Sequence, residues 1–334
     1  MPQMCARHLP TLTVTLLAAV LMWSAALAQG TATPPRWPER PIRLVVPFQA
    51  GSSSDTIARI VSQKLAERLG QQIVVENKVG AASVLGTEAV ARAEPDGYTL
   101  GLANTTTHAA TAALGGALPF DPIKDFAPVA MIADSPFVLL VTPGLAAHSV
   151  PELIAAAKAK PGALNYASAG IGSMAHLSGA LFANLAGVNI THVPYRGTSQ
   201  SMIDVMEGRI EILFGTIAPS LPHIRAGKLR ALATTGEARN SMLPELPTMA
   251  EAGLAGYESG LWTAFVYPAG VSPAIVAQLN AETNAVIRDP DVVAALQKQG
   301  VDVAAGGPDV LAARIKSDLA KWHDVVAKAG IKAK

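Results

Sequence analysis

Small and hydroxylated residues recur where a strand-like run gives way to a helix-like run, and the first such segment is residues 48–54. The candidate ligand contacts in it are Phe48, Ala50, Gly51, Ser52, Ser53 and Ser54. Small residues let an anion approach the backbone, and the first turn of a helix offers unpaired N–H groups and about half a positive charge. The segment therefore favours binding of a small anion such as a carboxylate. A simpler reading is that Ser54 or Asp55 caps the helix, and we expect one of them to do so.

Three further segments stand in the same relation to a predicted strand. Their candidate contacts are Ser83 after the second strand, Asn104 and Thr106 after the third, and Thr216 after the strand at 212–214. These hydroxyls and amides would donate to a carboxylate, or would only cap helices and close turns, which is the commoner role.

A fifth segment, residues 167–176, contains Gly170-x-Gly172-x-x-Ala175 and so matches a dinucleotide-binding fingerprint. The next predicted strand, 190–193, does not end in the acidic residue that would hold a ribose, which argues against NAD. The same geometry serves any anion. The candidate contacts here are Ser168, Ala169, Gly170, Ser173 and His176, the last about one turn inside the helix and equally well explained as a packed histidine.

Side chains suited to catalysis or metal binding form no recognisable pattern. Arg196 would pair bidentately with a carboxylate, although holding a neighbouring loop is the favoured role. There is no Gly-x-Ser-x-Gly elbow, and the seven histidines show no metal-ligand spacing. We therefore predict no catalytic residue, no metal and no cofactor. A secreted hydrolase that pairs Ser173 with His176 or His192 in space stays open as an alternative.

The elements that must position these segments alternate between strand and helix. Strands are predicted at 42–46, 72–75, 98–102, 138–141, 164–167, 190–193, 212–214 and 229–234. Helices are predicted at 54–69, 84–93, 150–159, 173–185 and 199–206, with a mostly helical tail at 273–329. This alternation predicts an α/β fold with mostly parallel sheets flanked by helices.

The first 28 residues are typical of a secretory signal peptide. Arg7 and His8 precede an apolar run that is short for a membrane span, and Ala26 to Ala28 provide a cleavage site. Cleavage leaves 306 of the 334 residues and removes Arg7, which brings Lys and Arg from 26 to 25 against 25 Asp and Glu. The neutral balance gives no sign of nucleic-acid binding. Cys5 is the only cysteine, so the mature chain has no disulfide. The predicted location is the periplasm.

Motifs in a fixed order connect these features to a known family. They are PIRLVVPF at 41–48, PDGYTL at 95–100, DFAPV at 125–129, LNYASAG at 164–170, HVPYRG at 192–197, HIRAGKLRAL at 223–232 and PTMAEAG at 247–253. With them the chain resembles the Bug-type extracytoplasmic solute receptors, the substrate-binding proteins of tripartite tricarboxylate transporters. The resemblance covers nearly the whole mature chain.

The resemblance implies a two-lobed periplasmic binding protein of the Venus flytrap type, with crossover hinge strands near 134–136 and 257–260. Lobe 1 would comprise 38–137 and 263–334, and lobe 2 would comprise 138–262. The implied ligands are dicarboxylates, acidic amino acids or aromatic acids. The carboxyl group of the ligand would be held between residues 48–54 and 168–173, and a hinge motion would close the lobes over it. The protein would act as a monomer and deliver the ligand to a membrane permease. A sensor that presents its closed form to a signalling receptor would use the same site.

The chain departs from the family pattern in four places. The family often has glycine where Ser52 stands, Asn-Arg in place of Asn77-Lys78, a glycine-richer stretch at 81–83, and Glu where Ala180 stands. The extra hydroxyls and bulk near the first loop indicate an altered choice of ligand.

Overall fold

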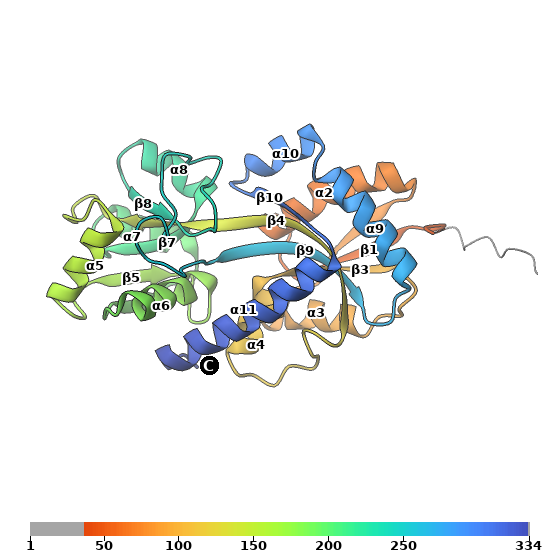
Figure 1. Ribbon diagram of the computed structural model, residues 1–334, viewed down its shortest axis with the longest axis horizontal. Helices are drawn as coiled ribbons and strands as arrows, with labels where there is room; N and C mark the ends of the chain where they lie inside the picture. The colour runs from red at the N-terminus through yellow and green to blue at the C-terminus, as the bar shows by residue number, and fades with distance from the viewer. Residues whose placement is uncertain (1–36, 333–334) are drawn as a thin grey trace, which may run out of the picture. The chain divides into compact units, whose positions relative to one another are not determined.

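Strands and helices alternate along residues 37–332, the part of the chain that the computed structural model describes (Figure 1). The first elements are β1 (Ile42–Val46), α2 (Ser53–Leu69), β2 (Ile73–Asn77), the 3-10 turn η1 (Ala81–Ser83), α3 (Val84–Ala91), β3 (Thr99–Asn104), the π-helical turn η2 (Thr106–Ala110), α4 (Thr111–Ala113) and β4 (Phe126–Val141). Then follow α5 (Val150–Ala159), β5 (Asn165–Ser168), α6 (Met174–Ala186), β6 (Thr191–Pro194), α7 (Thr198–Met206), β7 (Ile212–Thr216), α8 (Ile217–Arg225) and β8 (Arg230–Thr234). The last are β9 (Gly260–Pro268), α9 (Pro273–Val286), α10 (Pro290–Gln297), β10 (Asp302–Gly306) and α11 (Pro308–Ala329).

The predicted signal peptide lies outside the described residues. From Arg40 onward the chain forms one compact unit. Between residues 37 and 332 we find no helix that is both long and apolar enough to cross a membrane.

Two groups of parallel strands form the sheet, joined by β4 and β9. In the first group β1 pairs in parallel with β2 and β3, and in the second β5 pairs in parallel with β6 and β7. The pairings made by β4 and β9 are all antiparallel. The predicted α/β fold with two lobes is confirmed, whereas the antiparallel crossover pairings were not predicted.

Strand β4 changes partners halfway along its length, from β9 to β7, and the two strand groups lie on either side of this change (Figure 1). Pro136 is the last β4 residue opposite β9, and Phe137 lies opposite Thr216 at the end of β7. Asn104, at the end of β3, pairs with Thr263 of β9, and Thr263 pairs in turn with Ala133 of β4, so Asn104 and Ala133 lie at the same level of the sheet. The carboxyl ends of β3 and β7 therefore point toward each other across four residues of β4, about 13 Å of extended chain.

Three strand segments were missed from the sequence. They are the first half of β4, all of β9, and β10 inside a tail predicted to be mostly helical. The β10 sequence DVAAG has low intrinsic strand propensity, and it forms a strand because Asp302 and Val303 pair with Asp134 and Ala133 of β4.

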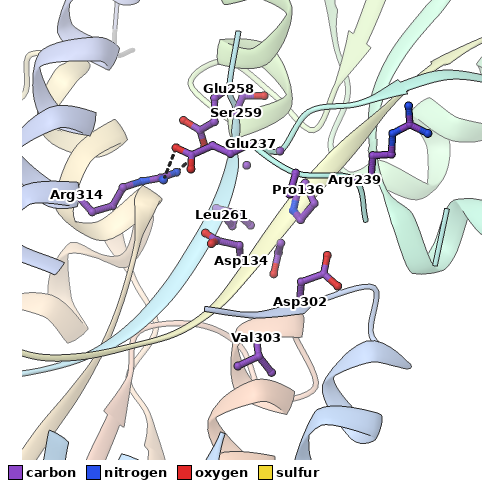
Figure 2. Close-up of a pocket in the computed structure, with 14 residues that line it drawn as sticks. Asp134, Pro136, Glu237, Arg239, Glu258, Ser259, Leu261, Asp302, Val303 and Arg314 are labelled. Carbon is purple, nitrogen blue, oxygen red and sulfur yellow. Dashed lines mark hydrogen bonds and ion pairs between the residues drawn. The ribbon is translucent and has the colours of Figure 1, made fainter. Parts of the chain in front are cut away.

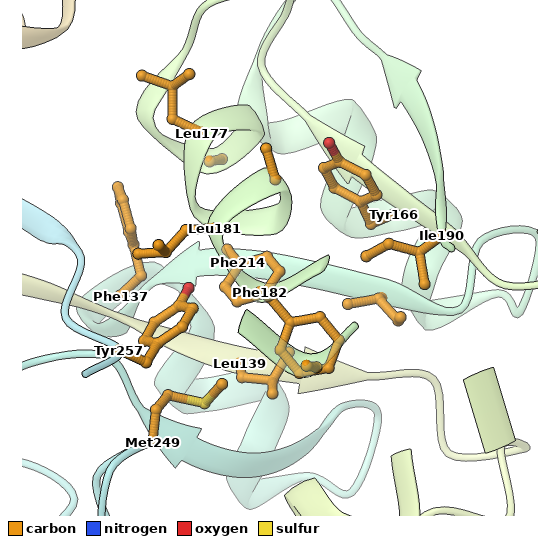
Figure 3. Close-up of a cluster of buried hydrophobic side chains, with 14 of the residues drawn as sticks. Phe137, Leu139, Tyr166, Leu177, Leu181, Phe182, Ile190, Phe214, Met249 and Tyr257 are labelled. Carbon is orange, nitrogen blue, oxygen red and sulfur yellow. The ribbon is translucent and has the colours of Figure 1, made fainter. Parts of the chain in front are cut away.

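The largest apolar cluster packs the second strand group against its helices (Figure 3). Tyr166, Phe182, Phe214 and Tyr257 are buried there. Gly179 lets α6 approach the Tyr166 ring, because a Cβ at that position would lie 2.2 Å from a ring carbon. This close packing fixes α6, and with it the loop that precedes α6.

Candidate ligand-binding site

The loop between β1 and α2 ends in a reciprocal capping box. Ser52 has the extended conformation of an N-cap (φ −67°, ψ 161°), and its Oγ accepts a hydrogen bond from the Asp55 N–H at 3.2 Å. Asp55 Oδ2 in turn accepts from the Gly51 N–H at 2.9 Å, and Gly51 has a φ of +79° that favours glycine. The prediction that Ser54 or Asp55 caps α2 is wrong, because Ser52 is the residue with extended backbone before the first helical turn.

Asp55 also joins the first loop to β2. Asn77 Nδ2 donates to Asp55 Oδ1 at 2.8 Å and to the Phe48 carbonyl at 3.0 Å, and Arg59 Nε donates to Asp55 Oδ2 at 2.9 Å. Burial raises the pKa of Asp55, but the hydrogen bonds from Arg59, Asn77 and Gly51 outweigh burial, so the pKa lies below its ordinary value. The loop is therefore held by an ionised carboxylate.

The loop between β5 and α6 repeats this arrangement with a different acceptor. Ser173 is the N-cap (φ −64°, ψ 154°) and accepts from the His176 N–H at 3.3 Å. His176 Nδ1 accepts from the Gly172 N–H at 3.1 Å, and Gly172 also has a φ of +79°. Both loops thus share the pattern Gly-Ser-x-x followed by a side-chain acceptor. The sequence carries this repeated spacing, but the spacing alone does not indicate that an aspartate and a histidine fill the same role.

The acceptor of the second box is an uncharged imidazole. Burial lowers the pKa of His176 to about 4, and since Nδ1 accepts a hydrogen bond, the ring proton is on Nε2. The His192 ring stacks on it with centroids 3.7 Å apart. Burial, and then the neighbouring His176, lower the pKa of His192 to about 4. The second loop therefore carries no ionised side chain in its capping box near neutral pH.

Each box leaves two backbone N–H groups of its helix without an acceptor in the part of the chain that the structure describes. The N–H groups of Gly51 and Asp55 are used within the first box, and that of Ser52 donates to the Gln49 carbonyl at 3.1 Å. Within residues 37–332 no acceptor faces the N–H groups of Ser53 and Ser54. In α6 the same holds for the pair that follows its N-cap, Met174 and Ala175. These four donors are the groups that an anion would meet.

The predicted contacts fall into two sets. Asn104 Nδ2 lies 3.4 Å from Ser54 Oγ, and Asn104 Oδ1 accepts from the Thr106 N–H at 2.9 Å, which joins the β3 loop to the first loop. The first set, on β1–β3 and the loops that follow them, comprises Phe48, Ala50, Gly51, Ser52, Ser53, Ser54, Ser83, Asn104 and Thr106. The second set, at the ends of β5–β7, comprises Ser168, Ala169, Gly170, Ser173, His176, Arg196 and Thr216. Among the described residues no hydrogen bond joins the two sets.

Two members of the second set take little part in these loops. Arg196 is exposed and forms no ion pair with any carboxylate that the structure describes. Thr216 is the N-cap residue of α8 but makes no side-chain cap, and its carbonyl accepts from Ser220 Oγ at 2.7 Å.

A serine–histidine pair exists, but it differs from the pair considered for a hydrolase. Ser168 Oγ lies 2.6 Å from His192 Nε2 and also accepts from the Gly170 N–H at 3.1 Å. Ser173 Oγ is used as the helix cap. Ser168 is 0 % exposed, so its hydroxyl has no open path to a substrate. The pair holds the second loop, and this geometry argues against nucleophilic catalysis.

A separate cavity of about 220 Å³ lies against the crossover segments of β4 and β9. Its wall includes Asp134, Glu258, Asp302 and Arg314, and Arg314 forms ion pairs with Glu258 and Glu237 (Figure 2). Burial, together with nearby Glu258, Glu237 and Asp318, raises the pKa of Asp134 to about 6 despite Arg314. None of the predicted loop contacts lines this cavity.

Comparison with known proteins gives a consistent result. Residues 57–331 match the family model described as "Tripartite tricarboxylate transporter family receptor". BugT of Bordetella pertussis is 36 % identical over 299 residues, which cover 89 % of this chain and 92 % of BugT. A protein of R. palustris solved with adipate is 35 % identical, with a TM-score of 0.74 over 89 % of this chain and 99 % of that one. MatC from Rhodopseudomonas palustris with bound malate is also 35 % identical, with a TM-score of 0.71 over 87 % of this chain and 100 % of that one. The chain therefore belongs to the receptor family of tripartite tricarboxylate transporters, which consists of periplasmic solute-binding proteins and not of enzymes.

Proposed function

We propose that this protein captures a small carboxylate between the two capping-box loops and delivers it to a tripartite tricarboxylate-type permease. The observation that carries the proposal is the pair of matched boxes at strand ends that point toward each other, each with two N–H donors that have no acceptor among the residues that the structure describes. Helix N-termini bind anions through such N–H groups and the helix dipole. The adipate and malate found on two relatives support a carboxylate as ligand.

The difference between the two boxes gives each loop its own part in binding. In the first box the buried Asp55 carboxylate partly offsets the positive potential at the start of α2. Arg59, which pairs with this carboxylate, restores only part of that potential, because its side chain is 51 % exposed and screened by water. In the second box the acceptor is the neutral His176, so the start of α6 keeps its positive potential. The α6 loop is therefore the stronger anion site, and the α2 loop completes the coordination of the carboxylate, directly or through water.

Capture by this route requires the two lobes to move. We propose the division into 38–137 with 263–334 and 138–262, and the change of β4 from β9 to β7 between Pro136 and Phe137 supports it. The two crossover strands would act as the hinge. The working form would be a monomer in the periplasm, with residues 1–28 removed.

A thermal-shift screen tests the proposal with acids and their uncharged amides. A ligand that binds only the native state stabilises it by RT ln(1 + [L]/Kd), about 2.7 kcal/mol at a hundredfold excess over Kd. We expect at least one small carboxylate, such as adipate, to raise the melting temperature while its diamide does not. If no acid shifts the melting temperature and an ester or amide is hydrolysed, the receptor proposal is wrong. If an acid does bind, its uptake by cells that lack this protein separates the two possible partners. Loss of uptake indicates a permease partner, and unchanged uptake indicates a signalling partner.

A further inference from the structure

The segment between β2 and α3 has an unusual backbone. Ala81, Ala82 and Ser83 have φ values of 46°, 52° and 78°, three consecutive non-glycine residues in the left-handed region. A Cβ disfavours this region and glycine does not. Backbone strain of this kind concentrates at binding and catalytic sites, where side chains are kept at a cost to stability.

The same segment exposes a group of apolar side chains. Val79 is 49 % exposed and Leu85 is 47 % exposed, and Ala81 and Ala82 are also exposed. Leu85 lies over Gly80, because a Cβ on that glycine would be 2.5 Å from Leu85 Cδ1. One exposed apolar side chain is ordinary, but a group of them next to a candidate site indicates a contact surface.

This apolar segment borders the first capping-box loop. A Cβ on Gly86 would lie 2.5 Å from the Lys78 carbonyl and 2.7 Å from Pro47 Cβ, so the start of α3 packs against the end of β1. Asn77 is bonded to the Phe48 carbonyl in the same place. Ile171 in the second loop is also 43 % exposed, and it stands between two glycines with positive φ.

We propose that Val79, Leu85 and Ile171 contact the carbon skeleton of the ligand and select carboxylates with an apolar chain or ring. The N–H groups of the two boxes take the carboxyl group, and the apolar side chains cover the rest of the molecule. Short acids leave these side chains in water and gain nothing from them. The inference rests on the proposed function, since it assigns the substrate class of the same site.

Three dicarboxylates of equal charge test the selection by isothermal titration calorimetry: succinate, adipate and terephthalate. Each buried methylene adds about fourfold in affinity, so adipate, with two more than succinate, should bind on the order of tenfold tighter. Leu85→Ser and Ile171→Ser should bring this ratio close to one by weakening the longer acids alone. Val310→Ser is the control, since Val310 is 55 % exposed in the first turn of α11 and should leave the ratio unchanged.

A glycine variant separates contact from scaffolding. Ala81→Gly with Ala82→Gly relieves the backbone strain at two of the three positions and should raise the melting temperature by roughly 2–4 °C. Ala81 and Ala82 belong to the same exposed apolar group as Val79 and Leu85. If this group covers the carbon chain of the ligand, the loss of the two methyl groups should lower affinity for adipate severalfold and leave affinity for succinate unchanged. A structural role alone would raise the melting temperature and leave both affinities unchanged.

Two results would overturn the inference in different ways. If succinate binds as tightly as adipate and terephthalate, or if the serine variants keep the wild-type ratio, the apolar contact is wrong and the receptor function stands. If none of the three acids binds the wild-type protein, the inference is wrong, and the proposed function fails with it only if the thermal-shift screen also finds no acid that binds.

Discussion

Replacing Ser53 by proline removes one of the four proposed anion donors at little cost to the fold. Ser53 is the first residue of α2, where proline fits the helix and its missing N–H breaks no internal bond. The preceding residue, Ser52, has φ −67° and ψ 161°, the extended conformation that a following proline requires. The Ser53 N–H has no acceptor among residues 37–332, so only a ligand would lose a partner.

The expected loss follows from the energy of one hydrogen bond to a charged group. Such a bond contributes about 1.5–3 kcal/mol, which corresponds to roughly 10- to 150-fold in Kd. Calorimetric titration of the tightest acid from the thermal-shift screen measures this change. The melting temperature of the ligand-free variant should stay within about 2 °C of wild type.

Ser52→Pro is the matched control for folding. The Ser52 N–H donates to the Gln49 carbonyl and its hydroxyl caps α2, so this variant should lose about 1–2 kcal/mol of stability. Equal affinity of Ser53→Pro and wild type, with both well folded, would refute the role of the α2 donors.

Three other predictions concern stability. His176 and His192 have pKa values of about 4 in the fold and about 6.5 when unfolded, so each contributes stability that is complete above pH 6.5 and is lost, at about 1.4 kcal/mol per pH unit, as pH falls toward 4. Denaturant titrations of the ligand-free protein at pH 7 and pH 5 check this, and equal stabilities would contradict it. Gly179→Ala should destabilise the protein by about 1–3 kcal/mol in urea melts, because the new Cβ would lie 2.2 Å from the Tyr166 ring. If the variant is instead more stable by about 1 kcal/mol, the amount expected from helix propensity alone, the Tyr166 ring moves freely. Asp318→Ala should cost about 3–5 kcal/mol, since this 2 % exposed carboxylate holds an indole N–H and two cations, and a loss under 1 kcal/mol would exclude a buried network.

Local pattern was enough to predict the strand–helix units and the loops between them. The apolar stripe of α2, with buried Ile57, Val61 and Leu65, gives that helix its period, and Gly70 in the left-handed conformation ends it. The pairing of strands that lie far apart in the sequence could not be predicted from local pattern. β10 is a strand only because β4 lies beside it, and nothing in DVAAG indicates that partner.

The candidate site shows the same division between local and long-range information. Serine and glycine residues at strand ends predicted anion-binding loops, but not which N–H groups remain free. That depends on bonds such as Asn77 to Phe48, across 29 residues, and Ser168 to His192, across 24. The shared Gly-Ser-x-x pattern is present in the sequence, but its role depends on the folded loops, in which Asp55 and His176 accept hydrogen bonds from equivalent glycines.

The structure of the protein with its bound acid is the most direct test of the central claim. We expect a carboxylate oxygen within about 3 Å, or one water molecule, of the N–H of Ser53 or Ser54 and of Met174 or Ala175. A carboxylate bound elsewhere, for example beside Arg314 in the cavity at the crossover strands, would contradict the account.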